Sequence, residues 1–391
     1  MFKKINLNII LRYNIKYKMS SNISNNIYYD LFQTNLENND DPPILCQFNE
    51  VRNQDFLTNP EDYKMSIVRF MIETPTLPLF RPTIQYTPID DVPSGIEPSN
   101  YTIYSITLRK VGTEELSQQF IEWSPQNKHI QMPNPPVLNT NTLQDNTNGY
   151  YDCYNYAWFL NLINNAFIKA STELSISNSP TIFYDSASKF FVMAAPKDNY
   201  DTNNTSGYYE IFMNKSLFQL FSSFPNVNIS ISKANGLNYQ IITNSYYGFS
   251  TQSVEIDTGT TECLMVYSEY STTYLWSPVS SIVFTSSSLP IVSTNLSNPI
   301  LTREGTPILF SGQPNTRRLI TDLVAGDSYK PYLVYTPSAE YRYIDLFKGR
   351  AIRDIDIQVY YQDKQGQLNE FKLSSGSSCS IKLLFTKKVQ L

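Results

Sequence analysis

Short β-strand patterns occupy both flanks of this 391-residue chain, and they restrict its fold more than any other feature. In the first flank, Tyr63–Glu73 has apolar side chains at both odd and even positions, so both faces of that strand can be buried. Such a strand is typical of the centre of a sheet in a sandwich. From Thr261 onward, strand patterns recur at a spacing of about 8–12 residues, as in sandwiches and barrels. We therefore predict a mainly β protein.

The clearest alternation lies in the last third of the chain. Ile355, Ile357 and Val359 alternate with polar residues at a period of two, and Asp363–Gly366 supplies a hairpin turn in which the glycine can take a positive φ. The strands expected in this third are Glu262–Tyr270, Val279–Thr285, Arg318–Val324, Pro331–Tyr335, Ile352–Tyr361, Gln367–Leu373 and Ser380–Thr386.

The middle of the chain has a different pattern, which indicates helix as well as strand. One apolar stripe with helical spacing consists of Tyr156, Leu160, Ile163, Phe167 and Ala170, and Asp152 is the expected N-cap. The hairpin expected next joins Thr181–Tyr184 to Lys189–Met193 through Asp185–Ser188. A short helix with Leu217, Leu220, Phe221 and Phe224 on one face follows, and Pro225 ends it. These elements predict an α+β block unlike its flanks.

The predicted domain organisation is therefore a β domain interrupted by a second domain. We expect a basic N-terminal extension at residues 1–18 and the first part of the β domain at residues 19–100. The inserted α+β domain is expected at residues 101–260, and the second part of the β domain at residues 261–391.

The N-terminal extension carries basic residues and no acidic one, and Met19 is an alternative start. Its basic residues are Lys3, Lys4, Arg12, Lys16 and Lys18. We interpret it as an upstream in-frame extension or a flexible arm, because Asn6 and Asn8 interrupt the apolar stretch that a signal peptide would need. A targeting or genome-contacting arm is the alternative.

The charge balance and the hydropathy of the chain exclude several classes of function. The formal net charge is −5, without a basic stripe, which argues against sequence-specific nucleic-acid binding. No run approaches the roughly 20 apolar residues of a membrane helix, so we expect no membrane span. The four cysteines lie far apart and form no CxxC pair, so we expect buried, reduced thiols rather than a zinc site or a disulfide framework. They are Cys46, Cys153, Cys263 and Cys379.

Side chains that commonly carry chemistry are scarce. His129 is the only histidine, so a site with several histidine ligands cannot form, and we favour an exposed loop imidazole over a catalytic dyad with Cys153. The loop Asp198–Gly207 has oxygen ligands suited to calcium, but its glycine spacing does not fit an EF-hand. We therefore predict no catalytic, cofactor-binding or metal-binding residues and no cofactor.

One tripeptide suggests an enzyme. Asp257-Thr258-Gly259 resembles the active-site turn of aspartic proteases, in which two carboxylates share a proton and activate water. The chain has no second such motif, so an active protease would require a dimer. We favour a turn at the end of a strand, and we keep the protease as the least favoured alternative.

Seven segments carry a resemblance to a known family, and they are Tyr154–Ala170, Thr181–Met193, Ser277–Ile291, Leu319–Asp322, Tyr335–Leu346, Ile355–Gly366 and Ser380–Lys387. In these segments the chain resembles the penton (vertex) capsid proteins of virophages and polinton-like viruses, of the Sputnik virophage type. The resemblance implies a single jelly-roll β-sandwich with an inserted α+β domain, which forms homopentamers at the fivefold vertices of an icosahedral capsid. A split sandwich of this kind has to pair early strands such as Tyr63–Glu73 with late ones such as Ile352–Tyr361.

These observations predict a structural virion protein and not an enzyme. The 29 tyrosines and 22 phenylalanines suit extensive subunit contacts, because aromatic side chains bury much area at little entropic cost. The expected partners are four further copies of the chain and the major capsid protein around the vertex, with a host surface receptor for the inserted domain. We expect assembly in the host cytoplasm. The alternative function is a jelly-roll fibre or attachment protein that binds host glycans.

Overall fold

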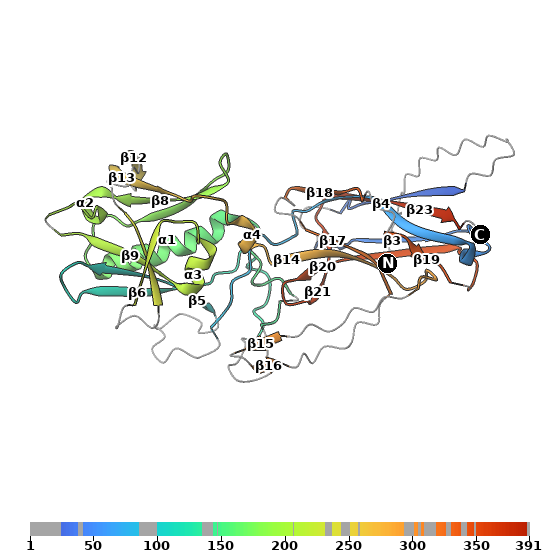
Figure 1. Cartoon of the computed structure of the whole chain (residues 1–391), viewed down its shortest axis with the longest axis horizontal. Helices are drawn as coiled ribbons and strands as arrows, with labels where there is room; N and C mark the ends of the chain where they lie inside the picture. The colour runs from blue at the N-terminus through green and yellow to red at the C-terminus, as the bar shows by residue number, and fades with distance from the viewer. Residues whose placement is uncertain are drawn as a thin grey trace, which may run out of the picture. The chain divides into compact units, whose positions relative to one another are not determined.

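The computed structural model is mainly β and divides into two compact units (Figure 1). It describes residues 25–37, 42–85, 100–134, 144–146, 148–205, 207–230, 237–243, 251–256, 259–292, 301–303, 306–308, 318–325, 330–337, 342–347 and 349–388. The predicted N-terminal extension and Met19 lie outside these ranges. Unit 1 contains the described residues up to Leu77 together with those from Val279 onward, and unit 2 is Pro78–Pro278.

Two antiparallel sheets build unit 1. The first has the strand order β1-β23-β4-β18, with β19 also paired to β4, and these strands are β1 (Asn26–Thr34), β23 (Ser378–Lys387), β4 (Tyr63–Glu73), β18 (Tyr332–Tyr335) and β19 (Ile344–Asp345). The second has the order β17-β14-β20-β21, with β3 also paired to β20, and these strands are β17 (Arg318–Val324), β14 (Val279–Ser286), β20 (Asp354–Asp363), β21 (Leu368–Glu370) and β3 (Gln47–Val51). The predicted central position of Tyr63–Glu73 is confirmed, because β4 has neighbours on both sides.

Smaller elements complete unit 1. They are β2 (Ile44–Leu45) paired with β22 (Lys372–Leu373), β15 (Leu301–Arg303) paired with β16 (Thr306–Ile308), and the 3₁₀ turn η1 (Pro60–Asp62). The predicted turn after β20 is present: the Gly366 amide donates to the Asp363 carbonyl oxygen at 2.9 Å, and Gly366 has a φ of 80°. The strands predicted for the last third are present, with ends that differ from the prediction by at most a few residues, except that Gln367–Leu373 forms two short strands, β21 and β22, in different sheets.

The partner predicted for Tyr63–Glu73 is wrong, although the pairing of early with late strands is confirmed. β4 pairs with β23, whereas β20 pairs with β14, β3 and β21. The reason is that β4 and β20 belong to different sheets. The rings of Phe70 on β4 and Phe284 on β14 meet edge to face across the two sheets, with centroids 4.7 Å apart.

Buried aromatic and sulfur contacts join the early and late strands inside unit 1. The Phe56 ring contacts Tyr29 on β1 and Phe385 on β23, with centroids 5.2 Å and 5.0 Å apart. The Sγ atoms of Cys46 and Cys379 lie 3.3 Å apart, and burial raises the pKa of the Cys46 thiol well above its usual value. All four cysteines are buried, as predicted.

Unit 2 contains a helix between two antiparallel sheets. Its elements are β5 (Tyr101–Lys110), β6 (Leu116–Glu122), α1 (Tyr156–Glu173), β7 (Thr181–Asp185), β8 (Phe190–Pro196), α2 (Lys197–Tyr200), β9 (Tyr209–Asn214), α3 (Lys215–Leu220), β10 (Asn226–Ser230), β11 (Leu237–Ile241), β12 (Thr251–Ile256), β13 (Gly259–Tyr267) and α4 (Thr273–Trp276). The sheet orders are β10-β11-β9-β5-β6 and β12-β13-β8-β7. Helix α1 contacts β5 and β6 of one sheet and β7 of the other (Figure 1). The predicted combination of helices and hairpin is present, but α3 ends at Leu220 and not, as predicted, at Pro225.

The predicted N-cap of this helix is wrong. Asn155 caps α1, since its Oδ1 accepts the Trp158 amide at 2.8 Å. Asp152 instead accepts two hydrogen bonds from the Arg81 guanidinium, from Nε at 2.8 Å and from Nη2 at 2.7 Å. Both side chains of this ion pair are almost completely buried. The predicted apolar stripe is correct, because Leu160, Ile163, Phe167 and Ala170 are buried and Tyr156 packs, partly buried, against the same core.

The limits of unit 2 differ from the boundaries expected at residues 101 and 260. Before β5, Phe80 forms an antiparallel bridge with Cys153, and Ile84 forms another with Thr102. After β13, Trp276 of α4 packs into the core of the unit. The segments before β5 and after β13, which lack regular alternation, thus belong to unit 2. The limits of the unit fall at Pro78 and Pro278.

An acidic side chain on β20 fixes the loop that follows β14. Asp356 accepts hydrogen bonds from the Ser286 and Ser287 hydroxyls at 2.6 Å and 2.5 Å, and from the Ser287 and Ser288 amides at 2.8 Å and 2.9 Å; the Ser288 hydroxyl also donates to it. Partial burial alone would raise the pKa of the Asp356 carboxyl, but the serine hydrogen bonds outweigh burial and lower it below its usual value.

The variant Asp356→Asn is therefore expected to destabilise unit 1 by about 1.5–3 kcal/mol near neutral pH, the range for hydrogen bonds to a charged group. Because the pKa is depressed in the folded state, the wild-type contribution is present above the unfolded pKa of about 3.9 and is lost as the pH falls below it. Hydrogen exchange of β14 and β20 amides at pH 7 measures the loss. Equal exchange rates in both proteins would contradict it.

Candidate functional site

The side chains that the sequence analysis weighed as catalytic candidates do not form a catalytic centre in the described part of the chain. His129 lies exposed in a loop, as predicted, whereas Cys153 is buried and its thiol donates to the Asn155 carbonyl oxygen at 2.9 Å. Within the described ranges, no group of three or more histidine, cysteine or acidic residues could hold a metal ion. No described helix is long and apolar enough to cross a membrane.

The two other motifs have different outcomes. Asp257 and Thr258 of the protease-like tripeptide lie outside the described residues; Gly259 begins β13 and pairs with Ile256 of β12. The calcium-like loop is closed by its own hydrogen bonds. Asp201 Oδ1 accepts the Asn203 amide at 3.0 Å, and the Asn204 side chain donates to the Asp198 carbonyl oxygen at 2.7 Å.

The first sheet of unit 1 carries exposed apolar side chains on its outer face. Along β1, Tyr28 and Phe32 are 58% and 59% exposed, while Tyr29 and Leu31 between them are buried. At the opposite edge, Tyr332 and Val334 of β18 are also exposed. We call this surface the outer face, and its residues are Tyr28, Asp30, Phe32, Arg69, Met71, Tyr332, Val334, Ser380, Lys382 and Leu384, of which Ser380 and Leu384 are buried.

The strand register aligns the outer face into rows. One row consists of the apolar side chains of Phe32, Met71 and Val334 together with the buried Ser380, and these residues lie opposite one another on the four strands. Beside it, Asp30 pairs with Arg69 at 3.2 Å and with Lys382 at 3.3 Å. One carboxylate facing two cations leaves this row positive. Because these charges are partly exposed, the ion pairs add little to folding stability. A role in contacts with another molecule therefore suits them better than a role in stabilising the fold.

Sequence reasoning did not identify β1 as a strand or its outward residues as a site. The signal was present, since Ile27, Tyr29 and Leu31 alternate with residues of the opposite face. Aromatic residues on that opposite face hid the alternation. Alternation along a strand shows which residues share a face, but it does not show what covers that face.

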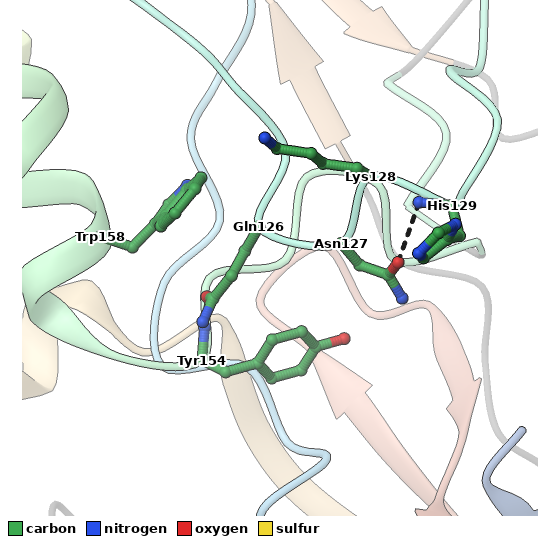
Figure 2. A pocket seen from close by; sticks show the side chains of 6 residues that line it. All are labelled: Gln126, Asn127, Lys128, His129, Tyr154 and Trp158. Atoms are coloured by element: carbon green, nitrogen blue, oxygen red, sulfur yellow. Dashed lines mark hydrogen bonds between the residues drawn. The ribbon is translucent and has the colours of Figure 1, made fainter. Parts of the chain in front are cut away.

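A second surface feature is an open pocket in unit 2. It has a volume of about 580 Å³ and is lined by Gln126, Asn127, Lys128, His129, Tyr154 and Trp158. Figure 2 shows the loop with Gln126–His129 on one side and Trp158, at the first turn of α1, on the other. The Trp158 indole N–H donates to the Ser124 carbonyl oxygen at 2.8 Å, and the Gln126 side chain accepts the Tyr154 amide at 2.9 Å. These bonds hold the walls of the pocket in place.

Comparison with known proteins identifies related sequences. The family model described as Sputnik minor capsid protein V18/19 matches residues 27–387. The protein described as uncharacterized protein V18 of Sputnik virophage is 33% identical over 149 residues, which are 38% of this chain and 84% of that protein. Structural protein V19 of the same virophage is 25% identical over 216 residues, which are 53% of this chain and 94% of that protein.

Two solved structures are similar over most of the chain. A chain of the 3.5 Å cryo-EM structure of Sputnik virophage is 27% identical, with a TM-score of 0.76 over 93% of this chain and 98% of that one. The mavirus penton protein has the same fold at 15% identity, with a TM-score of 0.62 over 93% of this chain and 99% of that one. The prediction of a structural capsid protein, not an enzyme, is therefore confirmed. The chain belongs to the Sputnik minor capsid protein V18/19 family and is a structural protein of a virophage capsid.

Proposed function

We propose that the chain is the penton subunit of its capsid and forms homopentamers at the fivefold vertices. The observation that carries this proposal is the apolar outer face of unit 1, which a soluble monomer would leave in water. Similarity to the mavirus protein, whose name describes it as a penton, supports the same function. The pentamer would contact the major capsid protein around the vertex and would assemble in the host cytoplasm.

The strand order supports a single jelly roll as the fold of unit 1. If β1, β3, β4, β14, β17, β18, β20 and β23 are numbered one to eight, the sheets read 1-8-3-6 and 2-7-4-5. Strands 1 and 8, 2 and 7, 3 and 6, and 4 and 5 are then antiparallel partners. A folded ribbon of four such pairs is a jelly roll. In this proposal unit 2 is an α+β domain inserted between the third and fourth strands.

Closed fivefold symmetry requires one surface of a subunit to contact a different surface of its neighbour. The outer face supplies a surface of the required kind, with exposed aromatic side chains on β1 around a positive row. Aromatic residues and arginine are enriched at protein interfaces, where they bury much area. We infer that Tyr28 and Phe32 lie in the contact between neighbouring copies.

The variant Phe32→Glu is expected to convert pentamers into monomers, because a buried unpaired carboxylate would oppose each of the five contacts. Native mass spectrometry of the purified full chain measures the change, with far-UV circular dichroism to establish that the fold is kept. Val324→Glu is the matched control, since Val324 is 80% exposed on β17 of the other sheet. Pentamers that persist in Phe32→Glu would contradict the contact. A wild-type chain that stays monomeric, alone and with the major capsid protein, would contradict the penton function.

A further inference from the structure

The pocket of unit 2 contains an aromatic ring that the fold does not cover. Of the three tryptophans, Trp123 and Trp276 are 3% and 2% exposed, whereas Trp158 is only half-buried and lines the pocket. Its indole N–H is already bonded to Ser124, and its backbone amide to Asn155, so the ring is fixed before any ligand arrives. A fixed ring loses little conformational entropy on binding.

The polar groups around this ring are mainly donors. The side-chain oxygens of Gln126 and Asn127 already accept the amides of Tyr154 and His129, at 2.9 Å and 3.0 Å. Among the described residues, no acceptor is bonded to either side-chain NH₂ group, and no carboxylate is paired with the exposed Lys128. None of the lining residues that the structure describes is acidic. In Figure 2 the Lys128 side chain extends toward the Trp158 side of the pocket.

We propose that this pocket binds an acidic saccharide unit, a pyranose ring that carries a carboxylate. A pyranose has an apolar C–H face that can lie on the indole of Trp158 and a rim of oxygens that can accept from the two amides. Its carboxylate would pair with the Lys128 ammonium at the open side. A volume of about 580 Å³ accommodates one or two sugar rings, and every described lining residue belongs to unit 2.

Matched acidic and neutral sugars test the proposal on the purified full chain. The probes are sialyllactose against lactose, and a hexuronate tetrasaccharide against a neutral hexose tetrasaccharide, titrated by calorimetry to roughly 10 mM. We expect saturable binding of at least one acidic probe and weaker binding of its neutral counterpart. Because the other two tryptophans are buried, the bound sugar should also protect Trp158 from acrylamide quenching.

Three variants separate the contacts. Trp158→Ala should weaken binding of the acidic probe by about tenfold or more. Lys128 lies in an exposed loop, so Lys128→Ala should not impair folding. It should weaken binding of the acidic probe by about fivefold and leave binding of the neutral probe unchanged. Tyr270→Ala removes a 50% exposed aromatic ring of unit 2 outside the pocket and should leave binding unchanged.

Three results would overturn the acidic-saccharide site. They are no binding of either acidic probe, equal binding of acidic and neutral probes, and binding that survives Trp158→Ala with its affinity intact. None of them bears on the penton function, because the variants of the outer face change the oligomeric state and the variants of the pocket do not.

Discussion

Trp276→Ala is expected to destabilise unit 2 by about 3–5 kcal/mol, the cost of removing a large buried aromatic ring. Trp276 stacks on Phe191, with centroids 4.7 Å apart, and meets the rings of Phe80, Tyr156, Phe159 and Phe221 within 5.7 Å. The methyl group of alanine leaves most of that space empty. Urea unfolding followed by tryptophan fluorescence measures the effect in unit 2 alone, since all three tryptophans lie within Pro78–Pro278.

The indole hydrogen bond accounts for little of this loss. Trp276 Nε1–H donates to the Leu220 carbonyl oxygen at 3.0 Å, but the Thr272 hydroxyl donates to the same oxygen at 2.7 Å. The carbonyl therefore keeps a partner in the variant. Trp276→Phe, which keeps an aromatic ring and loses the N–H, should cost less than half as much as Trp276→Ala. Equal losses in the two variants would show that the hydrogen bond, and not the packing, dominates.

Arg81→Ala is expected to destabilise unit 2 by a similar amount, about 3–5 kcal/mol, because it leaves the Asp152 carboxylate buried without its cation. The two side chains are 5% and 6% exposed, so water cannot replace the guanidinium. The ion pair also joins the segment before β5 to the loop before α1, two parts of unit 2 that are far apart in sequence. The same fluorescence measurement reports the loss.

An exposed ion pair is the matched control for Arg81→Ala. Lys197 and Glu262 also lie in unit 2, 3.4 Å apart, with side chains that are 38% and 56% exposed. Lys197→Ala should change the free energy of unfolding by no more than about 1 kcal/mol. The double variant Arg81→Ala/Asp152→Ala should lose less than the sum of its single variants, since no unpaired charge remains. Additive losses would mean that the two side chains act independently.

Local patterns in the sequence predicted the elements but not their neighbours. The helical stripe of α1 and the alternation of β20 depend on residues a few positions apart, so both were predictable. The pairing of β4 with β23 was not, because alternation gives the face of a strand and not its partner. The N-cap failed for a similar reason. Asp152 and Asn155 are both suitable cap residues by type, and the bond of Asp152 to Arg81, 71 positions away in sequence, could not be read from the local pattern.

The candidate surfaces were less predictable than the fold. From the sequence, the aromatic residues Tyr28 and Phe32 would be expected in the core. The structure of β1 and its register show that both lie on the exposed face. Trp158 gave a clearer signal, since it lies off the buried stripe of α1 and is therefore only partly buried against the core. The loop with Gln126–His129 that completes the pocket precedes α1 in the chain, and no local pattern relates the two.

The position of β23 has a consequence for synthesis of the protein. This strand joins β1 to β4 in the first sheet, yet it follows every other strand in the chain. While a ribosome makes the intervening residues, β1 and β4 have no partner between them, whereas unit 2 is contiguous and has all its contacts available. A chain that stops before Ser378 therefore has unit 2 complete and unit 1 open, so only finished chains can present the outer face to a neighbour.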